Sequence, residues 1–246
     1  MLLLVALAVG GLIPIQTAAN SRLRLSVGNK PVVSALVSFS VALLVAVLAT
    51  TALQGNPVPQ FADGVSAPWW VWLGGAMGVC FVLGNILLFP RLGAVQTVVL
   101  PILGQVMMGL CIDRFGLFGA PVLPVSWMRV LGAVVVLAGI VVVLRAGKRP
   151  AVEGDAAGLE LWLFRALGVL VGVGSAVQTA VNGYLGTIAG SSLHAGEINL
   201  AVGALLLLVA ALVVARASSH AGPSRGRGGC GSAASSAPRL SSRARR

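Results

Sequence analysis

Charged and metal-binding side chains are scarce in this chain. Only 9% of its 246 residues are charged, and it contains 2 His and 3 Cys residues. It has no phosphate-binding glycine loop and no His/Cys cluster with the spacing of metal ligands, so an ATP-driven pump and a metal centre are unsupported and we expect no cofactor. The cysteines, Cys80, Cys111 and Cys230, are odd in number and lack CxxC spacing, which predicts free thiols.

Hydrophobic residues make up 57% of the chain, and its mean hydropathy is +0.98. A soluble domain could not bury that much apolar surface, so the composition indicates a membrane protein. A helix needs about 20 apolar residues to cross a bilayer. Seven segments meet this length, and they predict an all-α, polytopic transmembrane helix bundle: residues 2–19, 32–53, 69–89, 93–112, 126–144, 161–182 and 195–215.

The formal net charge of +11 would suit a nucleic-acid binder, but the distribution of the charge argues against one. Seven of the 17 Lys and Arg residues lie within residues 216–246, and most of the others flank apolar segments. We therefore expect the lipid bilayer, and not nucleic acid, to be the partner of the basic residues.

Two similar strings indicate that the chain repeats one unit. GGLIPIQTAANSRL begins at residue 10 and GVGSAVQTAVNGYL at residue 172, so Gln16 aligns with Gln178 and Asn20 with Asn182. Spacing of i,i+4 places both amides of a pair on one helix face. Basic residues follow only the first string, which predicts that the two copies cross the membrane in opposite orientations. Such an inverted repeat is typical of secondary transporters.

Loop charges predict the orientation of the whole chain. The tail and the loops on one side hold fourteen Lys and Arg residues, whereas the other side holds Arg114 and Arg129. Cytoplasmic loops carry the positive charge, so we expect the N-terminus outside and the C-terminal tail in the cytoplasm. Three tryptophans after Pro68 suit an outer interfacial belt, with a tryptophan-rich ligand cage as the alternative.

Polar side chains inside apolar segments are costly, so they mark candidate functional positions. Inverted copies would bring the repeated amides towards a common pseudo-symmetry axis, and Gln105 lies beside a proline and a glycine that permit a broken helix. The expected solute path is therefore lined by Gln16, Asn20, Gln105, Gln178 and Asn182.

Two carboxylates, Asp113 and Glu197, are candidates for proton coupling. The structural alternatives are that Asp113 ends a helix beside Arg114 and that Glu197 stabilises a helix N-terminus. For single amides we favour a role in joining helices. These amides are Asn85, Gln96 and Asn199.

Several strings resemble the YdcZ-like branch of the drug/metabolite transporter superfamily. They are PIQTAANSRLR (14–24), PWWVWLGGAMGVCFVLGNILLFPRLGA (68–94), LPILGQVMMGLCIDRFGLFG (100–119) and the second QTAVN. The resemblance spans about residues 1–215. It implies a multi-pass protein of the bacterial inner membrane, built from a five-helix unit that either pairs as antiparallel subunits or is duplicated in one chain. It implies a transporter of an unidentified small solute that works by alternating access, without an established catalytic residue.

Two other functions compete with this interpretation. An intramembrane serine protease would use Ser175 as nucleophile and His194 as base, but GVGSAV lacks the usual glycine after the serine, and we expect no enzyme. The stronger alternative is a non-transporting fragment or a partner subunit of a membrane complex.

The expected domains are a first five-helix repeat at 1–144, a cytoplasmic linker at 145–160, a partial second repeat of two helices at 161–215 and a basic tail at 216–246. The tail is rich in Ser, Gly, Ala and Arg and has too little apolar area to fold. Its composition is also that of a GC-rich gene read out of frame. We expect a disordered segment, with a frameshift as its origin and a lipid-binding tail as the alternative.

Overall fold

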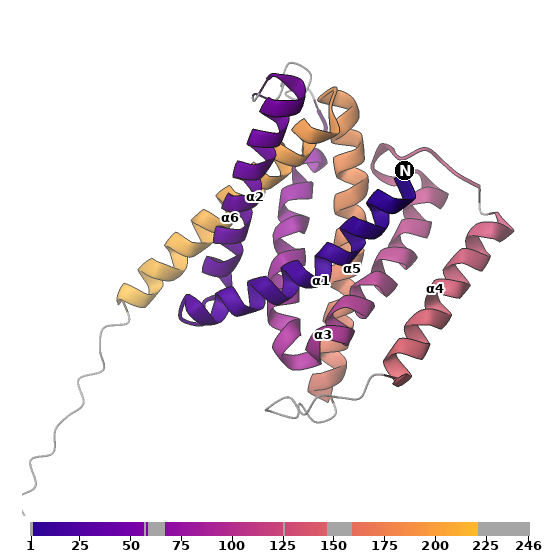
Figure 1. The fold of residues 1–246 in the computed structure, drawn as a ribbon, viewed down its shortest axis with the longest axis horizontal. Helices are drawn as coiled ribbons and strands as arrows, with labels where there is room; N and C mark the ends of the chain where they lie inside the picture. Colours follow the sequence, from indigo (N-terminus) through magenta and orange to yellow (C-terminus); the bar gives the residue numbers. More distant parts are fainter. Residues whose placement is uncertain (1, 57, 59–66, 125, 147–158, 221–246) are drawn as a thin grey trace, which may run out of the picture.

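The computed structural model describes residues 2–56, 58, 67–124, 126–146 and 159–220, and its regular structure is entirely helical (Figure 1). The elements are α1 (Leu2–Ser26), α2 (Pro31–Gln54), the short 3-10 helix η1 (Trp69–Trp72), α3 (Leu73–Phe115), η2 (Leu117–Gly119), α4 (Trp127–Ala146), α5 (Leu159–Ile188) and α6 (Ser192–His220). Within these ranges, five spans are long and apolar enough to cross a membrane. The predicted all-α membrane bundle is therefore confirmed.

Helix α3 accounts for two of the predicted segments because it turns sharply near its middle. Gly93 has φ 73° and ψ 173°, a conformation that is open only to glycine. Pro90, three residues earlier, lacks a backbone N–H and weakens the helix at the same place. The helix therefore forms two arms, a first arm at 73–92 and a second arm at 94–115, which spread apart in Figure 1.

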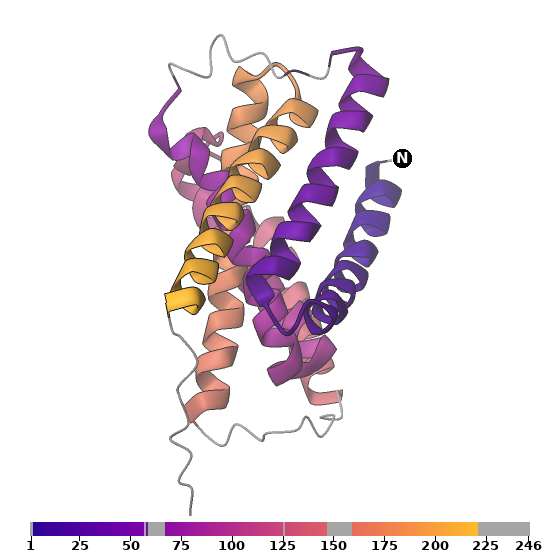
Figure 2. The ribbon, with the colours of Figure 1, turned by 90° about the vertical axis from the view of Figure 1, so that its left-hand side faces the viewer.

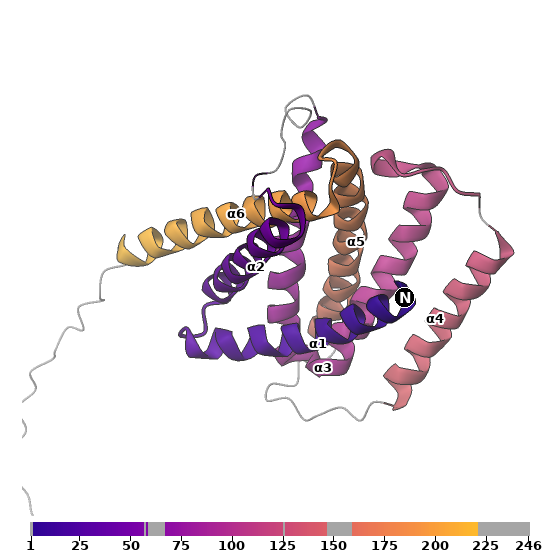
Figure 3. The ribbon, with the colours of Figure 1, turned by 45° about the horizontal axis from the view of Figure 1, so that its top comes forward.

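Helix α5 lies between the two arms of α3, as Figures 1 and 3 show. Glycines on both helices permit this close approach. A Cβ atom at Gly104 would overlap the carbonyl oxygen of Val169, and one at Gly172 would overlap the carbonyl oxygen of Pro101. Since the obstructing atoms are backbone atoms, only glycine fits at these positions. The contact between α3 and α5 is the largest in the bundle.

The two repeated helix pairs run in opposite directions. In Figures 1 and 2, α1 descends and α2 ascends, whereas α5 ascends and α6 descends. Helix α2 packs on α6, and α1 packs on α3 and α2. These directions are those that an inverted repeat requires. The sides of the membrane on which the loops lie stay a prediction.

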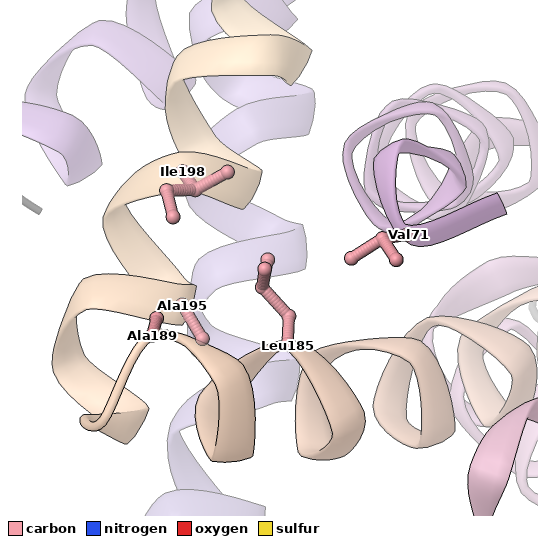
Figure 4. Close-up of a cluster of buried hydrophobic side chains, with 5 residues drawn as sticks. All are labelled: Val71, Leu185, Ala189, Ala195 and Ile198. Carbon is pink, nitrogen blue, oxygen red and sulfur yellow. The ribbon is translucent and has the colours of Figure 1, made fainter. Parts of the chain in front are cut away.

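One end of the bundle is closed by a cluster of buried hydrophobic side chains (Figure 4). The cluster joins η1, the end of α5 and the start of α6 through Val71, Leu185, Ala189, Ala195 and Ile198. Trp70 extends this contact, because its ring lies 4.9 Å from the ring of Tyr184 and 5.7 Å from the ring of Phe118. Trp69 and Trp72 are exposed, and their place in an interfacial belt stays a prediction.

Some predicted boundaries differ from the observed ones. Helix α1 continues to Ser26, so Arg22 and Arg24, expected in a loop, lie in its last turns. Helix α6 continues to His220, beyond the predicted end at 215. Side chains that flank apolar segments can remain helical, and composition does not mark where they stop. Most of the predicted linker (147–158) and of the tail (221–246) lies outside the described residues.

Candidate functional site

A cavity of about 230 Å³ lies between α1, both arms of α3 and α5. Two of these helices, α3 and α5, are among the spans long and apolar enough to cross a membrane, and the two arms of α3 are joined at the turn at Gly93. The polar lining consists of Thr17, Asn85, Thr97, Gln105 and Ser175. None of the lining side chains carries a charge, so the cavity combines apolar walls with a few hydrogen-bonding groups. This is the usual constitution of a small-molecule site.

Asn85 is the most unusual member of this lining. It lies on the first arm of α3, only 5% of its surface is exposed, and its Oδ1 atom is buried without a hydrogen-bond partner in the part of the chain that the structure describes. A buried amide oxygen without a donor costs about 1–3 kcal/mol. Its position on a cavity wall indicates that a donor on a bound molecule or a water would satisfy it.

The other polar groups of the cavity are tied to their own helices or to each other. Gln105 on the second arm donates from Nε2 to the Oγ atom of Ser175 on α5 at 3.2 Å. The hydroxyl of Thr97 donates to the carbonyl oxygen of Gly93 at 2.8 Å, and that of Thr17 to the carbonyl oxygen of Ile13 at 3.0 Å. These bonds fix the other polar side chains that line the cavity.

Of the predicted path residues, Gln105 alone lines this cavity. Gln178 and Asn182 lie instead where α5 meets the start of α3. A Cβ atom at Gly78 would come 2.8 Å from Nε2 of Gln178, and one at Gly74 would come 2.6 Å from Oδ1 of Asn182. The two amides therefore pack into space that these glycines leave free.

The first repeated pair has different surroundings. Gln16 is exposed, whereas Asn20 is buried and its backbone oxygen accepts a 2.8 Å hydrogen bond from Ser34 on α2. Helix α1 packs on α2 and α3, whereas α5 has its largest contact with α3, so the two repeated pairs lie on helices with different neighbours. A role of these amides in transport stays a prediction.

Charged side chains lie near the ends of the helices. Asp113, at the end of α3, pairs with Arg129 at the start of α4 at 2.9 Å. At the opposite end of the bundle, Arg91 pairs with Glu160 at 2.8 Å. Both pairs are partly exposed, and such pairs contribute at most about 1 kcal/mol to stability. Asp113 thus lies near the end of its helix, next to Arg114 in the sequence, and its ion-pair partner is Arg129 on α4.

Glu197 is buried within α6, with 3% of its surface exposed. Neither carboxylate oxygen has a hydrogen-bond partner among the described residues. It does not line the cavity of Asn85, and its proposed part in coupling stays a prediction. His194, one turn earlier, has its Nε2 atom 3.3 Å from the carbonyl oxygen of Asn56. Ser175 bonds Gln105, so the pair suggested for a serine protease has separate partners.

The sequence does not single out Asn85 as a cavity residue. No similar string repeats it, as one repeats Gln16 at Gln178, and the sequence favours a helix-joining role for it. Thr17, Thr97 and Ser175 also gave no signal, because hydroxyl groups are common in apolar helices, where they bond the preceding turn.

A bundle of apolar helices, five spans of which are long enough to cross a membrane in the described chain, defines a multi-pass membrane protein. The chain matches the family described as "Putative inner membrane exporter, YdcZ" over residues 1–142 and 163–226. It therefore belongs to this family, as the resemblance of its strings implied, and is an integral protein of the inner membrane. The second match ends at residue 226, beyond the predicted start of the tail at 216. The chain matches no curated protein and no solved structure.

Proposed function

We propose that this protein is a secondary transporter of a small solute and that the cavity between α1, α3 and α5 is its solute site. The observation that carries the proposal is Asn85, which lines the cavity and whose buried Oδ1 atom has no hydrogen-bond partner among the described residues. A buried amide oxygen without a hydrogen-bond donor destabilises the empty protein, and a donor group on a bound solute would remove this cost.

Alternating access would follow from the arrangement of the helices around this cavity. The two arms of α3 are joined only by the turn at Gly93, and α1 contributes one wall while making few other contacts. Movement of α1 relative to α3 would expose the cavity to one side of the membrane or to the other. The absence of phosphate-binding motifs from the sequence is consistent with transport driven by a proton gradient or by the gradient of the solute itself.

The test is solute release from proteoliposomes loaded with a small-molecule extract of the host cells. Compounds that leave faster than from protein-free vesicles are identified by mass spectrometry. Asn85→Leu removes the acceptor but keeps the branched shape and the number of heavy atoms, and loss of one hydrogen bond of about 1 kcal/mol should slow release of the transported solute about fivefold or more.

A matched pair of variants separates the cavity from general effects on the membrane helices. Thr97 and Thr51 both bond the carbonyl group four residues earlier, at 2.8 Å and 2.7 Å, but only Thr97 lines the cavity. Thr97→Val should therefore reduce release, whereas Thr51→Val should not. If no compound leaves faster than from empty vesicles, or if Asn85→Leu releases it at the normal rate, the proposed function is wrong.

A further inference from the structure

A second hollow adjoins the proposed solute site. A groove of about 320 Å³ runs between the second arm of α3 and α4, and Gln105 lines both the groove and the cavity of Asn85. The Asp113–Arg129 pair lies at one end of the groove, and the other lining residues are apolar or small. They are Val106, Gly109, Leu110, Gly132, Ala133 and Val136. Gln105 is thus the residue at which the two spaces meet.

The depth of Gln105 in the membrane makes its exposure unusual. It lies near the middle of the second arm, and at 1.5 Å per residue about 15 Å separate it from either end of that arm. It is nevertheless exposed, and its amide nitrogen bonds the hydroxyl of Ser175. A polar amide that is exposed at mid-membrane depth is costly and marks a functional position.

The groove has empty space beside a glycine on each of its two walls. Cβ atoms placed at Gly109 on α3 or Gly132 on α4 would meet nothing within 4 Å. Helix α4 stands at the margin of the bundle in Figures 1 and 3, and it is the least buried of the five apolar spans in the described chain. At this depth the surroundings of the groove are the acyl chains of the bilayer.

The charges of the two spaces restrict what can pass. The cavity lining has no charged side chain, and the two charges of the groove neutralise each other at 2.9 Å. An ionic solute would lose its hydration without gaining a counter-charge. A neutral solute with a hydrogen-bond donor would cross the apolar groove and satisfy Asn85.

Because the groove adjoins the cavity at Gln105, we propose that the transported solute reaches the cavity sideways from the bilayer through the α3–α4 groove. This solute is an uncharged, membrane-soluble small molecule with a hydrogen-bond donor. The hydrogen bond between Gln105 and Ser175 lies across the passage and must open for the solute to enter. This inference rests on the proposed function for the role of the cavity, but its test does not require transport.

The test measures the reaction of a single cysteine in the cavity with reagents of different charge. The reporter is Val98→Cys, in a chain whose three native cysteines are replaced by alanine, because Val98 lines the cavity and carries no polar group. Reconstituted protein is treated with N-ethylmaleimide, which is neutral and membrane-soluble, or with a cationic methanethiosulfonate. Each rate is divided by the rate on denatured protein. We expect the cationic reagent to be slower by at least about tenfold.

Filling the groove should slow the neutral reagent. Gly132→Leu and Gly109→Leu place a side chain in the open space, and each should reduce the N-ethylmaleimide rate severalfold. Gly139→Leu is the matched control, since Gly139 is on the same helix as Gly132 and is equally free of neighbours but does not line the groove. Two filling variants keep the test decisive if one of them fails to fold.

Equal rates for the two reagents, absence of reaction with N-ethylmaleimide, or an unchanged rate in a folded groove-filling variant would overturn the inference. Solute release that depends on Asn85, together with such a result, would leave the proposed function intact and refute only lateral entry. Conversely, charge-selective labelling without any solute release would refute the transporter.

Discussion

The packing of α5 between the arms of α3 predicts that a glycine-to-alanine substitution has different effects on stability at two equivalent positions of the repeat. Gly172 on α5 and Gly10 on α1 occupy the same place in the two strings. A Cβ atom at Gly172 would overlap the backbone carbonyl of Pro101, whereas one at Gly10 would have nothing within 4 Å. Gly172→Ala should therefore be destabilising and Gly10→Ala should not.

The expected magnitude follows from what each methyl group meets. The backbone of the second arm cannot rotate away as a side chain can, so the two helices must separate, and overpacking of this kind costs about 1–3 kcal/mol or more. For a chain of this length each kcal/mol corresponds to about 2–4 °C in the unfolding midpoint, so Gly172→Ala should lower it by roughly 2–12 °C. Gly10→Ala should leave it unchanged or raise it, because alanine favours the helix by up to about 1 kcal/mol.

The assay is thermal unfolding of the purified protein in detergent, followed by the loss of the monodisperse peak in size-exclusion chromatography. Gly104→Ala should behave like Gly172→Ala, because a Cβ atom at Gly104 on α3 would overlap the backbone carbonyl of Val169 on α5. Equal midpoints for Gly172→Ala and Gly10→Ala would refute the close contact between α5 and the second arm.

Three other outcomes follow from the same structure. Gln178→Leu should lower the unfolding midpoint, since this side chain packs against α3, whereas Gln16→Leu should leave it unchanged because Gln16 is exposed; the same thermal assay checks both. Reporter domains fused after Lys30 and after Gly190 should report cytoplasm and exterior respectively, and one side for both would contradict the inverted repeat. Asp113→Asn should lower stability by at most about 1 kcal/mol, and a larger loss would show that the Asp113–Arg129 pair is more than a surface contact.

The fold class could be predicted from composition, because apolar stretches of membrane-spanning length leave few alternatives to helices. The turn between the two arms could also be placed near residues 90–93, where proline and glycine occur close together. Opposite directions for the repeated helices agree with the difference in charge after the two strings. The fold class, the turn in α3 and the helix directions depend on local composition, which can be read from the sequence without knowledge of the fold.

The site could not be predicted in the same way. Helices that are apolar on all sides carry no stripe that tells which face meets which neighbour. Repetition therefore drew attention to Gln16, which the structure leaves exposed, and away from Asn85, which it places on the cavity wall. Only the positions of α1 and α5 around the two arms distinguish these amides, and those positions depend on contacts between distant segments.

The central claim is that the cavity beside Asn85 binds the transported solute. Its most direct test is protection of Val98→Cys from N-ethylmaleimide by the solute identified in the release assay, with Thr51→Cys, which lies on α2 outside the cavity, as the control. The account predicts that the solute slows labelling at position 98 in proportion to its occupancy, that it has no effect at position 51, and that Asn85→Leu weakens the protection. Equal labelling of position 98 with and without a saturating concentration of a transported solute would contradict it.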